Sequence, residues 1–385
     1  MNIKKYFPLI VALIVIAGTI WYLEKQKPQR VPVESSPLGR IESSNAPTVS
    51  NVPAPQDRTS LLKQKAASFP SGQELAGIQG YINTDKFKLA DLVGKKVILI
   101  DFWTYSCINC LRTLPYLNAW YEKYKDKGLV IVGVHTPEFE FEKNYDNVAK
   151  AVKDLGIHYP VVLDSNRATW GAYNNSYWPR EYLIDIDGYI VHDKIGEGDY
   201  DGTERAIQIA LKERQTVLGA KESIDTAIAV PKDMIPMDSS QIGSPETYFG
   251  SDRNEYLGNG TKGVAGAQTL FLPRTIDPNT LYLDGTWKFD AEFARSMSNT
   301  ARIVFTYTAK NVYFVGSSEK GVVVKVMRDG KPFGSETGGD VDKEGNVLIQ
   351  TNRLYKLIQG SDYAEHTIEI EVTSPGLQAF TFTFG

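Results

Sequence analysis

The cysteine usage constrains this chain of 385 residues most, because it contains only two cysteines, Cys107 and Cys110, with two residues between them. Two cysteines cannot form a scaffold of several disulfides, so each folded unit must be stabilised by its own hydrophobic core. A structural zinc site needs a full tetrahedral set of cysteine and histidine ligands, and the four histidines are scattered along the chain. We therefore expect no metal at this pair.

The charge balance argues against a nucleic-acid partner. The formal net charge is −4 and 23% of the residues are charged, so the chain has no basic excess. Since 42% of the residues are hydrophobic, a chain of this length is expected to form about two or three folded units.

The N-terminus carries an apolar segment. Lys4 and Lys5 precede an uncharged run at residues 6–23, and a helix of roughly 18 residues approaches the hydrocarbon thickness of a bilayer. We expect residues 1–23 to form a single transmembrane anchor at the cell membrane, with the folded part on the extracytoplasmic side. A cleaved signal peptide is the alternative. Residues 24–58 are rich in proline, serine and asparagine without apolar periodicity, which predicts a disordered linker.

Residues 59–218 alternate between short apolar runs and amphipathic stretches. Runs typical of buried strands lie at residues 97–101, 129–134 and 159–163, followed by an expected hairpin at residues 181–196. Helical periodicity follows the first two runs and returns after the hairpin. This order predicts an α/β fold in which helices flank both faces of a mixed sheet.

The cysteine pair falls where the first predicted strand passes into the first predicted helix. The free amides and the macrodipole of a helix start stabilise a nearby anion, which favours a nucleophilic thiolate at Cys107. Cys110 lies one turn further on, at an α-carbon separation of about 5 Å that a disulfide can bridge. One sulfur can then attack a substrate disulfide while the other resolves the mixed intermediate. Two buried, inert cysteines are the alternative interpretation.

Residues 219–385 have a different pattern. Helical periodicity gives way to short runs rich in valine, threonine and aromatic residues that alternate with period two, and Asp329 and Gly330 mark a hairpin turn. About eight such runs predict an antiparallel sandwich.

Several of these segments resemble the thioredoxin superfamily. The stretch "DFWTYSCINC" at residues 101–110 is similar to the thioredoxin pattern D-F-W-A-x-W-C-G-P-C. A closer similarity, to the membrane-tethered DipZ-like and TlpA-like branch, continues through "YKDKGLVIVGVHTPEFEFEK" and "YNNSYWPREYLIDIDG". The resemblance implies a thioredoxin fold for residues 59–218.

The resemblance also implies roles for five residues. Cys107 corresponds to the attacking cysteine, Cys110 to the resolving one, and Asp101 to a buried acid of raised pKa that accepts the second thiol's proton. Trp103 corresponds to the aromatic beside the active site, and Pro179 to the family's cis-proline. A solvated acid, a core tryptophan and an ordinary trans-proline are the respective alternatives.

The sequence departs from thioredoxin around the pair. Ser106 replaces the tryptophan before the first cysteine, and Ile108 and Asn109 replace Gly-Pro. Because the intervening residues affect the relative stability of thiolate and disulfide, the reduction potential does not transfer. His135 follows its strand as the pair follows the strand before, so we expect it either near the pair or packed in a turn.

The resemblance implies a thiol-disulfide oxidoreductase, expected to work as a reductase, whose only redox group is the Cys107-Cys110 disulfide. Its implied partners are substrate proteins with disulfides and a separate membrane electron donor of the cytochrome c biogenesis type.

The C-terminal part resembles a second module of the same family. The motif "SPETYFG" at residues 244–250 is similar to the start of the C-terminal module of DipZ-like proteins. The resemblance implies an all-β jelly-roll sandwich that is similar to carbohydrate-binding modules. A glycan is therefore a further implied partner, for which Tyr248, Tyr256 and Trp287 are candidate contacts.

Two other functions fit parts of the sequence. Thr104 lies three residues before Cys107, as in thiol peroxidases of the peroxiredoxin type, although Ile100 stands where those enzymes have proline. A glycan-binding surface protein that uses the thioredoxin unit only as a scaffold is the alternative from a different class.

Overall fold

The computed structural model describes residues 58–332 and 334–385. The predicted anchor at residues 1–23 lies outside these residues, as does the predicted linker at residues 24–58 except for Arg58, which begins a helix. Within the described part of the chain, no helix combines the length and the apolar character needed to span a membrane.

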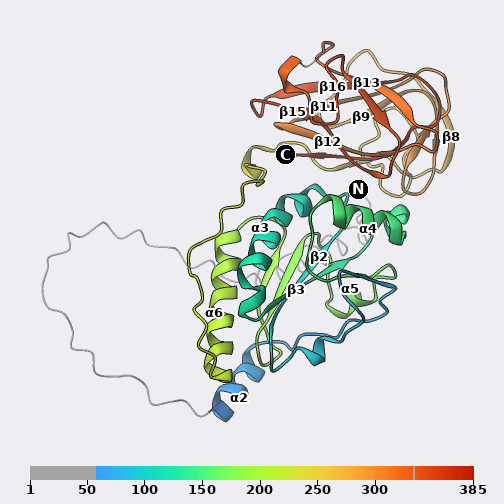
Figure 1. Ribbon diagram of the computed structural model, residues 1–385. Helices are drawn as coiled ribbons and strands as arrows, with labels where there is room; N and C mark the ends of the chain where they lie inside the picture. Colours follow the sequence, from blue (N-terminus) through green and yellow to red (C-terminus); the bar gives the residue numbers. More distant parts are fainter. Residues whose placement is uncertain (1–57, 333) are drawn as a thin grey trace, which may run out of the picture. The chain divides into compact units, whose positions relative to one another are not determined.

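The first domain is built on a six-stranded sheet with the strand order β1-β4-β3-β2-β5-β6. Figure 1 shows β2 and β3 in the middle of this domain. Its strands are β1 (Gly80–Ile82), β2 (Val97–Trp103), β3 (Leu129–His135), β4 (Val161–Leu163), β5 (Arg180–Ile184) and β6 (Ile190–Ile195). Its α-helices are α2 (Arg58–Ser68), α3 (Ile108–Tyr124), α4 (Tyr145–Asp154), α5 (Ala168–Ala172) and α6 (Tyr200–Leu218). Short 3-10 helices are η2 (Leu89–Asp91), η3 (Lys125–Lys127) and η4 (Glu140–Lys143).

Strand directions confirm the predicted mixed sheet. β2, β3 and β4 are parallel, whereas β1, β5 and β6 join the sheet antiparallel to their neighbours. Helices α2 and α5 and strand β1 were not predicted from the sequence, because a polar helix and elements of three and five residues carry little periodicity.

The central strand β2 is buried along its whole length because side chains cover both of its faces. Leu99 and Trp103 belong to the core shared with α3, α4 and α6, whereas Ile98 and Ile100 belong to the core on the α5 side. The continuous apolar run of β2 follows from this two-sided burial. Asp101 alternates in phase with Leu99 and Trp103, so its side chain faces the α3, α4 and α6 layer.

The second domain is all-β, as predicted, with eleven strands among the described residues. These strands are β7 (Thr247–Tyr248), β8 (Gly266–Leu270), β9 (Leu281–Phe289), β10 (Ala294–Ser296), β11 (Ala301–Thr308), β12 (Asn311–Ser317), β13 (Val322–Arg328), β14 (Asn346–Ile349), β15 (Arg353–Gln359), β16 (Glu365–Val372) and β17 (Gln378–Phe384). The 3-10 helices η5 (Ser239–Gln241) and η6 (Gly334–Glu336) lie outside the sheet.

The strands of this domain form one continuous sheet, in place of two separate sheets of a sandwich. Its order is β14-β13-β16-β11-β9-β10-β17-β12-β15, with β7 paired to β17 and β8 to β9. The long strand β9 joins the two halves, because residues 281–284 pair with β11 and the residues that follow pair with β8 and β10. Gly285 lies at the change of partner with a φ of 92°, a conformation that glycine adopts at little cost.

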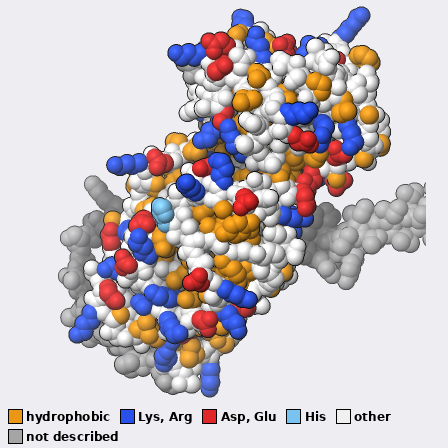
Figure 2. All heavy atoms as spheres, turned by 45° about the vertical axis from the view of Figure 1, so that its right-hand side comes forward, with side chains coloured by type: hydrophobic (Ala, Val, Ile, Leu, Met, Phe, Trp, Pro, Cys, Tyr) orange, Lys and Arg blue, Asp and Glu red, His pale blue; other side chains and the backbone are white. Residues whose placement is uncertain are grey.

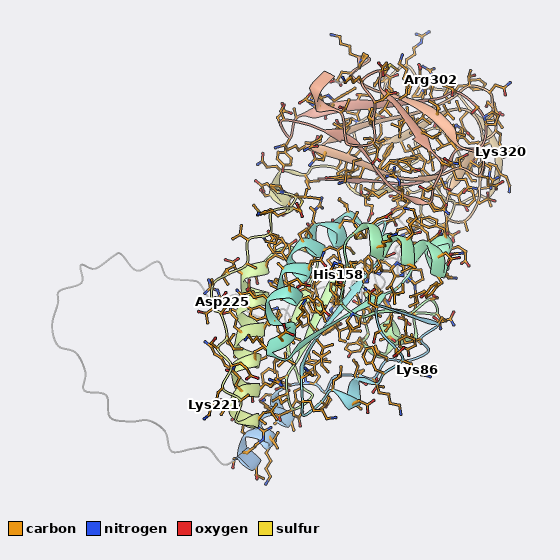
Figure 3. The ribbon with its side chains drawn as sticks, viewed as in Figure 1. Lys86, His158, Lys221, Asp225, Arg302 and Lys320 are labelled. Atoms are coloured by element: carbon orange, nitrogen blue, oxygen red, sulfur yellow. The ribbon has the colours of Figure 1, made fainter. Side chains whose placement is uncertain are left out.

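The described residues between α6 and β7 form no strand, and the first of them contact the first domain. Its carbonyl at Asp225, beside α6 in Figure 3, accepts a hydrogen bond of 3.1 Å from the Tyr124 hydroxyl. The amide of Ala229 donates to the Glu204 carboxylate at 2.7 Å. The first residues after the predicted boundary at 218/219 therefore lie against the first domain.

Candidate active site

The two cysteines lie at the start of α3, as the sequence predicts. Cys107 is the N-cap residue of the helix and is partly exposed, whereas Cys110 is only 1% exposed in the first turn. Both side chains belong to the same packed cluster, in which Cys110 is part of the core and Cys107 packs against it. Burial raises the pKa of Cys110 well above its ordinary value, and the neighbouring Cys107 and Asp101 add to the increase. The two sulfurs therefore have different surroundings. The Cys107 sulfur is partly accessible, whereas the Cys110 sulfur is buried and retains its proton.

Asp101 lies in the middle of β2, beneath the pair. It is 1% exposed, and neither carboxylate oxygen has a hydrogen-bond partner among the described residues. Burial, followed by the negative charge of Glu181, raises the pKa of Asp101 well above its ordinary value. A solvated strand-end residue, the alternative interpretation, does not fit this environment.

Glu181 is a buried acid that the sequence analysis missed. It is the cross-strand neighbour of Asp101 on β5 and is 3% exposed. Burial raises the pKa of Glu181 to about 7, although a hydrogen bond from Thr203 and the charge of Lys194 oppose the increase. A signal was present in the sequence, since Glu181 stands in phase with Leu183 in a strand that is otherwise apolar on that face.

The resemblance singles out two other residues, Trp103 at the end of β2 and Pro179 just before β5. Trp103 is fully buried and meets His135 edge-on, with ring centroids 5.1 Å apart. The Trp178–Pro179 peptide bond is cis, as predicted. The indole nitrogen of Trp178 donates to the Thr136 carbonyl at 3.1 Å, which fixes the loop before Pro179 against the end of β3.

His135 lies beside the loop that leads to Cys107. Its ring stacks on Tyr105 with centroids 5.6 Å apart, and its Nε2 is 3.4 Å from the Thr104 hydroxyl. Burial lowers the pKa of His135 to about 3, so the imidazole stays neutral and cannot supply a positive charge to the cysteine pair. Its contacts make it a packing residue of the active-site loop.

Glu142, a second acid that the sequence analysis missed, holds this loop in place. Its Oε1 accepts a hydrogen bond of 2.6 Å from the Ser106 hydroxyl, and its Oε2 accepts bonds from the amides of Glu138 and Phe139 at 2.7 and 3.0 Å. The carboxylate is completely buried. Ser106, the residue before Cys107, stands where thioredoxins have tryptophan. Its hydrogen bond to Glu142 connects this loop to η4.

The second domain contributes side chains to the surroundings of the pair. Ile108, between the two cysteines, is 4% exposed in an apolar cluster with Phe139, Tyr313, Leu354 and Phe380. This cluster buries one flank of the Cys-x-x-Cys turn and leaves the Cys107 sulfur partly accessible.

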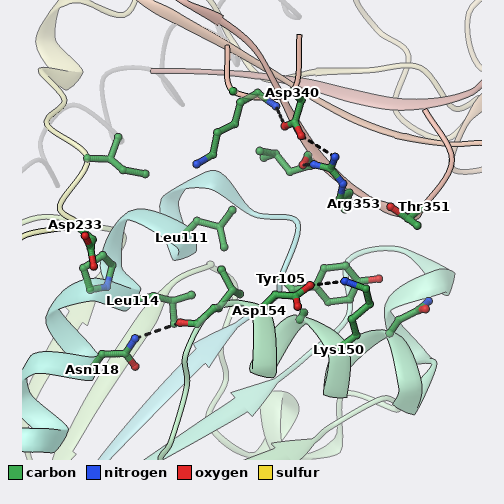
Figure 4. A pocket seen from close by; sticks show the side chains of 18 of the residues that line it. Tyr105, Leu111, Leu114, Asn118, Lys150, Asp154, Asp233, Asp340, Thr351 and Arg353 are labelled. Carbon is green, nitrogen blue, oxygen red and sulfur yellow. Dashed lines mark hydrogen bonds and ion pairs between the residues drawn. The ribbon is translucent and has the colours of Figure 1, made fainter. Parts of the chain in front are cut away.

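A cavity of about 650 Å³ lies next to this cluster (Figure 4). Tyr105, Leu111 and Leu114 supply apolar lining from the active-site loop and α3. Asp340 and Arg353 supply polar lining from the second domain and are joined by a hydrogen bond of 2.7 Å. Since Leu111 directly follows Cys110, a chain segment in this cavity would lie close to the cysteine pair.

Two of the three candidate sugar contacts are already engaged. Trp287 is fully buried in the core of the second domain, and its indole nitrogen donates to the Asp284 carbonyl at 2.9 Å. The Tyr248 hydroxyl donates to Glu138 at 2.8 Å, and the Arg253 guanidinium stacks on the Tyr248 ring at 3.6 Å. Tyr256 is partly exposed.

One acidic cluster in the described part of the chain has the spacing of a metal site, but a lysine fills it. Asp185, Asp187 and Glu213 converge on the Lys65 ammonium, with distances of 2.6 and 2.9 Å to the two aspartates. The ammonium supplies the positive charge that these carboxylates need.

Comparisons with known proteins point to the same protein family. The family described as Redoxin matches residues 65–208, and the Thioredoxin like C-terminal domain matches residues 244–385. Protein DipZ from Mycobacterium bovis is 40% identical over 320 residues, which cover 83% of this chain and 43% of DipZ. The thiol-disulfide oxidoreductase YkuV from Bacillus subtilis is 30% identical over 142 residues, which cover 37% of this chain and 95% of YkuV.

A third relative is also a thiol-disulfide oxidoreductase. The thiol-disulfide oxidoreductase ResA from Bacillus cereus is 36% identical over 124 residues, which cover 32% of this chain and 68% of ResA. The chain belongs to the thioredoxin-like thiol-disulfide oxidoreductases. It spans less than half the length of the DipZ protein that it matches.

Proposed function

We propose that the chain is a membrane-tethered, extracytoplasmic thiol-disulfide oxidoreductase that reduces disulfides of substrate proteins through Cys107 and Cys110. The observation that carries this proposal is the asymmetry of the pair, in which a partly exposed sulfur at a helix start lies beside a buried one. Family membership supports the reaction type.

The proposed reaction has two steps. The Cys107 thiolate attacks one sulfur of the substrate disulfide, which forms a mixed disulfide and releases the first substrate thiol. Cys110 then loses its proton to Asp101 and attacks the Cys107 sulfur, which releases the second substrate thiol and leaves a Cys107-Cys110 disulfide. Two electrons pass from the dithiol to the substrate, and the carboxyl group at Asp101 takes up the proton that the second attack requires.

The location and the partners belong to the same proposal. The uncharged run at residues 6–23 supports a membrane anchor, and the positively charged residues before it are typical of such segments. A dithiol that becomes oxidised at each turnover needs a reductant, so we propose a separate membrane electron donor of the cytochrome c biogenesis type. The cavity beside Leu111 supports binding of an extended substrate segment, and Tyr256 remains the one partly exposed candidate for a glycan.

Trapping of the intermediate tests the function. Cys110→Ser should accumulate a mixed disulfide between Cys107 and a substrate protein, visible as a shift on a non-reducing gel that dithiothreitol abolishes. Cys107→Ser should form no such adduct, because the remaining thiol is buried. Both variants should lose insulin-disulfide reduction driven by dithiothreitol to background.

Two controls separate this function from the alternatives. Wild-type protein that consumes peroxide faster than it reduces insulin would be a thiol peroxidase. If the double variant Cys107→Ser/Cys110→Ser supported normal growth and still bound glycans, the thioredoxin unit would be a scaffold and the proposal would be wrong.

A further inference from the structure

A row of ionisable side chains crosses the first domain beneath the cysteine pair. Asp101 on β2 pairs in register with Glu181 on β5, and Glu181 pairs in register with Lys194 on β6, the edge strand of the sheet. Directly opposite residues of antiparallel strands project from the same face with about 5 Å between their β-carbons. The two carboxyl groups are therefore neighbours on the face that α3, α4 and α6 cover.

The surroundings of these two acids offer little to stabilise two negative charges. Both are at least 97% buried, and Asp101 has no hydrogen-bond partner among the described residues. Thr203, in the first turn of α6, lies near Glu181 and opposes the increase in its pKa. Cys110 lies near Asp101, and Tyr159, which precedes β4, lies near both acids. The Tyr159 hydroxyl is also without a partner in the described part of the chain.

One positive charge and one imidazole lie toward the edge of the sheet. Lys194 is half-buried opposite Glu181, and its ammonium also donates to the Ile195 and Glu197 carbonyls at 3.0 and 3.1 Å. His192 is half-buried, and its Nε2 is 3.1 Å from the Thr203 hydroxyl. Glu181 is thus the member of the row that connects Asp101 to groups near solvent.

We propose that Glu181 is a positioning residue of the redox site that acts through Asp101, because the two neighbouring carboxyl groups together hold one proton and thereby set the basicity available to Cys110. The inference rests on the proposed function and deepens it. When Cys110 attacks the mixed disulfide, its proton passes to the carboxyl pair, and the pair later returns this proton to solvent past Thr203 and His192. The negative charge of Glu181 keeps Asp101 basic enough to accept the proton of a buried thiol.

The resolving step can be measured by itself with dithiobis(nitrobenzoate), a small aromatic disulfide whose released thiolate absorbs visible light. Attack by Cys107 releases one equivalent, and attack by Cys110 on the resulting mixed disulfide releases a second. We expect two kinetic phases in the wild-type chain, with the rate of the second phase rising with pH as the carboxyl pair loses a proton.

Two variants should move the pH midpoint of the second phase in opposite directions. Glu181→Gln keeps the shape and the acceptor for Thr203 but removes a negative charge beside Asp101, so the midpoint should fall by about one pH unit. Lys194→Met removes the positive charge that favours ionised Glu181, so the midpoint should rise, by about half a unit because Lys194 is partly exposed. Lys212→Met, at an exposed position on α6, is the matched control and should leave the midpoint unchanged.

The outcomes separate this inference from the proposed function. Two equivalents with unmoved midpoints in both variants, or a first phase that shifts as much as the second, would overturn the role of Glu181 and leave the reaction intact. A wild-type chain that releases fewer than two equivalents would instead remove the proposed function. If Glu181→Gln does not fold, as judged by circular dichroism, the upward shift in Lys194→Met decides the question, and its absence counts against the pair.

Discussion

At the scale of single residues, the chemistry of the site depends on differences in burial and hydrogen bonding between groups of the same type. Cys107 is partly exposed at a helix start, whereas Cys110, one turn away, is buried above a carboxyl group that has no hydrogen-bond partner in the described structure. Leaving Asp101 in this state costs folding free energy, because a buried charge without a partner is poorly solvated. Such a cost is typical of positions that serve a reaction rather than stability.

Replacement of Asp101 by asparagine should therefore stabilise the protein while it slows the reaction. At neutral pH, Asp101→Asn should raise the free energy of unfolding by about 1–3 kcal/mol, since it removes a buried, unpaired carboxyl group. It should also slow the second phase of the dithiobis(nitrobenzoate) reaction at least tenfold, because general-base assistance is lost.

The pH dependence of stability gives an independent test of Asp101. Its pKa is raised in the folded chain, so the folded state keeps a proton that the unfolded state releases above about pH 4. Wild-type stability should fall as pH rises from that value toward the raised pKa, and urea titrations of Asp101→Asn should show a shallower fall. An identical slope in the two proteins would mean that Asp101 is not buried as described.

At the scale of elements, the site is assembled from parts that come from separate stretches of sequence. The start of α3 presents the cysteines, β2 and β5 bring two acids into register, and η4 anchors the loop before Cys107 through Glu142. Helix α2 is attached differently. It is polar along most of its length, and its one buried residue is Lys65, whose ammonium meets three carboxylates.

This attachment predicts that one lysine decides whether α2 docks. Lys65→Met should lower the free energy of unfolding by about 2–3 kcal/mol, less than the roughly 3–5 kcal/mol of a fully buried ion pair because Glu213 is 25% exposed. Urea denaturation measures this loss. The control Lys63→Met, at an exposed position on the same helix, should change stability by less than about 0.5 kcal/mol. Equal effects of the two variants would contradict the ion-pair cluster.

Turns illustrate which elements a sequence can place accurately. Asp329 and Gly330 form the predicted tight turn, with φ values of 54° and 71°, and Arg328 and Lys331 exchange hydrogen bonds of 2.9 and 3.0 Å across it. Aspartate and glycine both tolerate positive φ, so this signal is local and could be read directly. The change of partner along β9 has no comparable local signal, because it depends on which strands lie on either side.

At the scale of the whole molecule, each domain has a core of its own, and one apolar cluster contains side chains from both. The surface in Figure 2 carries interspersed acidic and basic side chains over the face shown.

The apolar cluster with side chains from both domains is centred on aromatic contacts. Phe380 lies 5.1 Å from Phe139 and 5.0 Å from Phe141, measured between ring centroids, and it is 3% exposed.

This cluster predicts how cooperatively the two domains unfold. Phe380→Ala should cost about 3–5 kcal/mol and resolve two thermal transitions by calorimetry, because the domains then lose their main apolar connection. Phe271→Ala, at a side chain that is 75% exposed, should leave the thermogram unchanged. A wild-type protein that already unfolds in two well-separated transitions would show that the cluster does not couple the domains.

The sequence alone determined the α/β and all-β division and the strand-helix junction of the cysteine pair, because both rest on local periodicity, and the family resemblance around Pro179 implied the cis-proline. Only the tertiary structure decided which distant side chains meet. Glu181 and Glu142 lie many residues from the cysteines, and Trp287 and Tyr248 are taken up by packing and by hydrogen bonds. Strand register and burial depend on contacts between segments far apart in the chain, and those contacts determine whether a carboxylate ionises or an aromatic ring remains free.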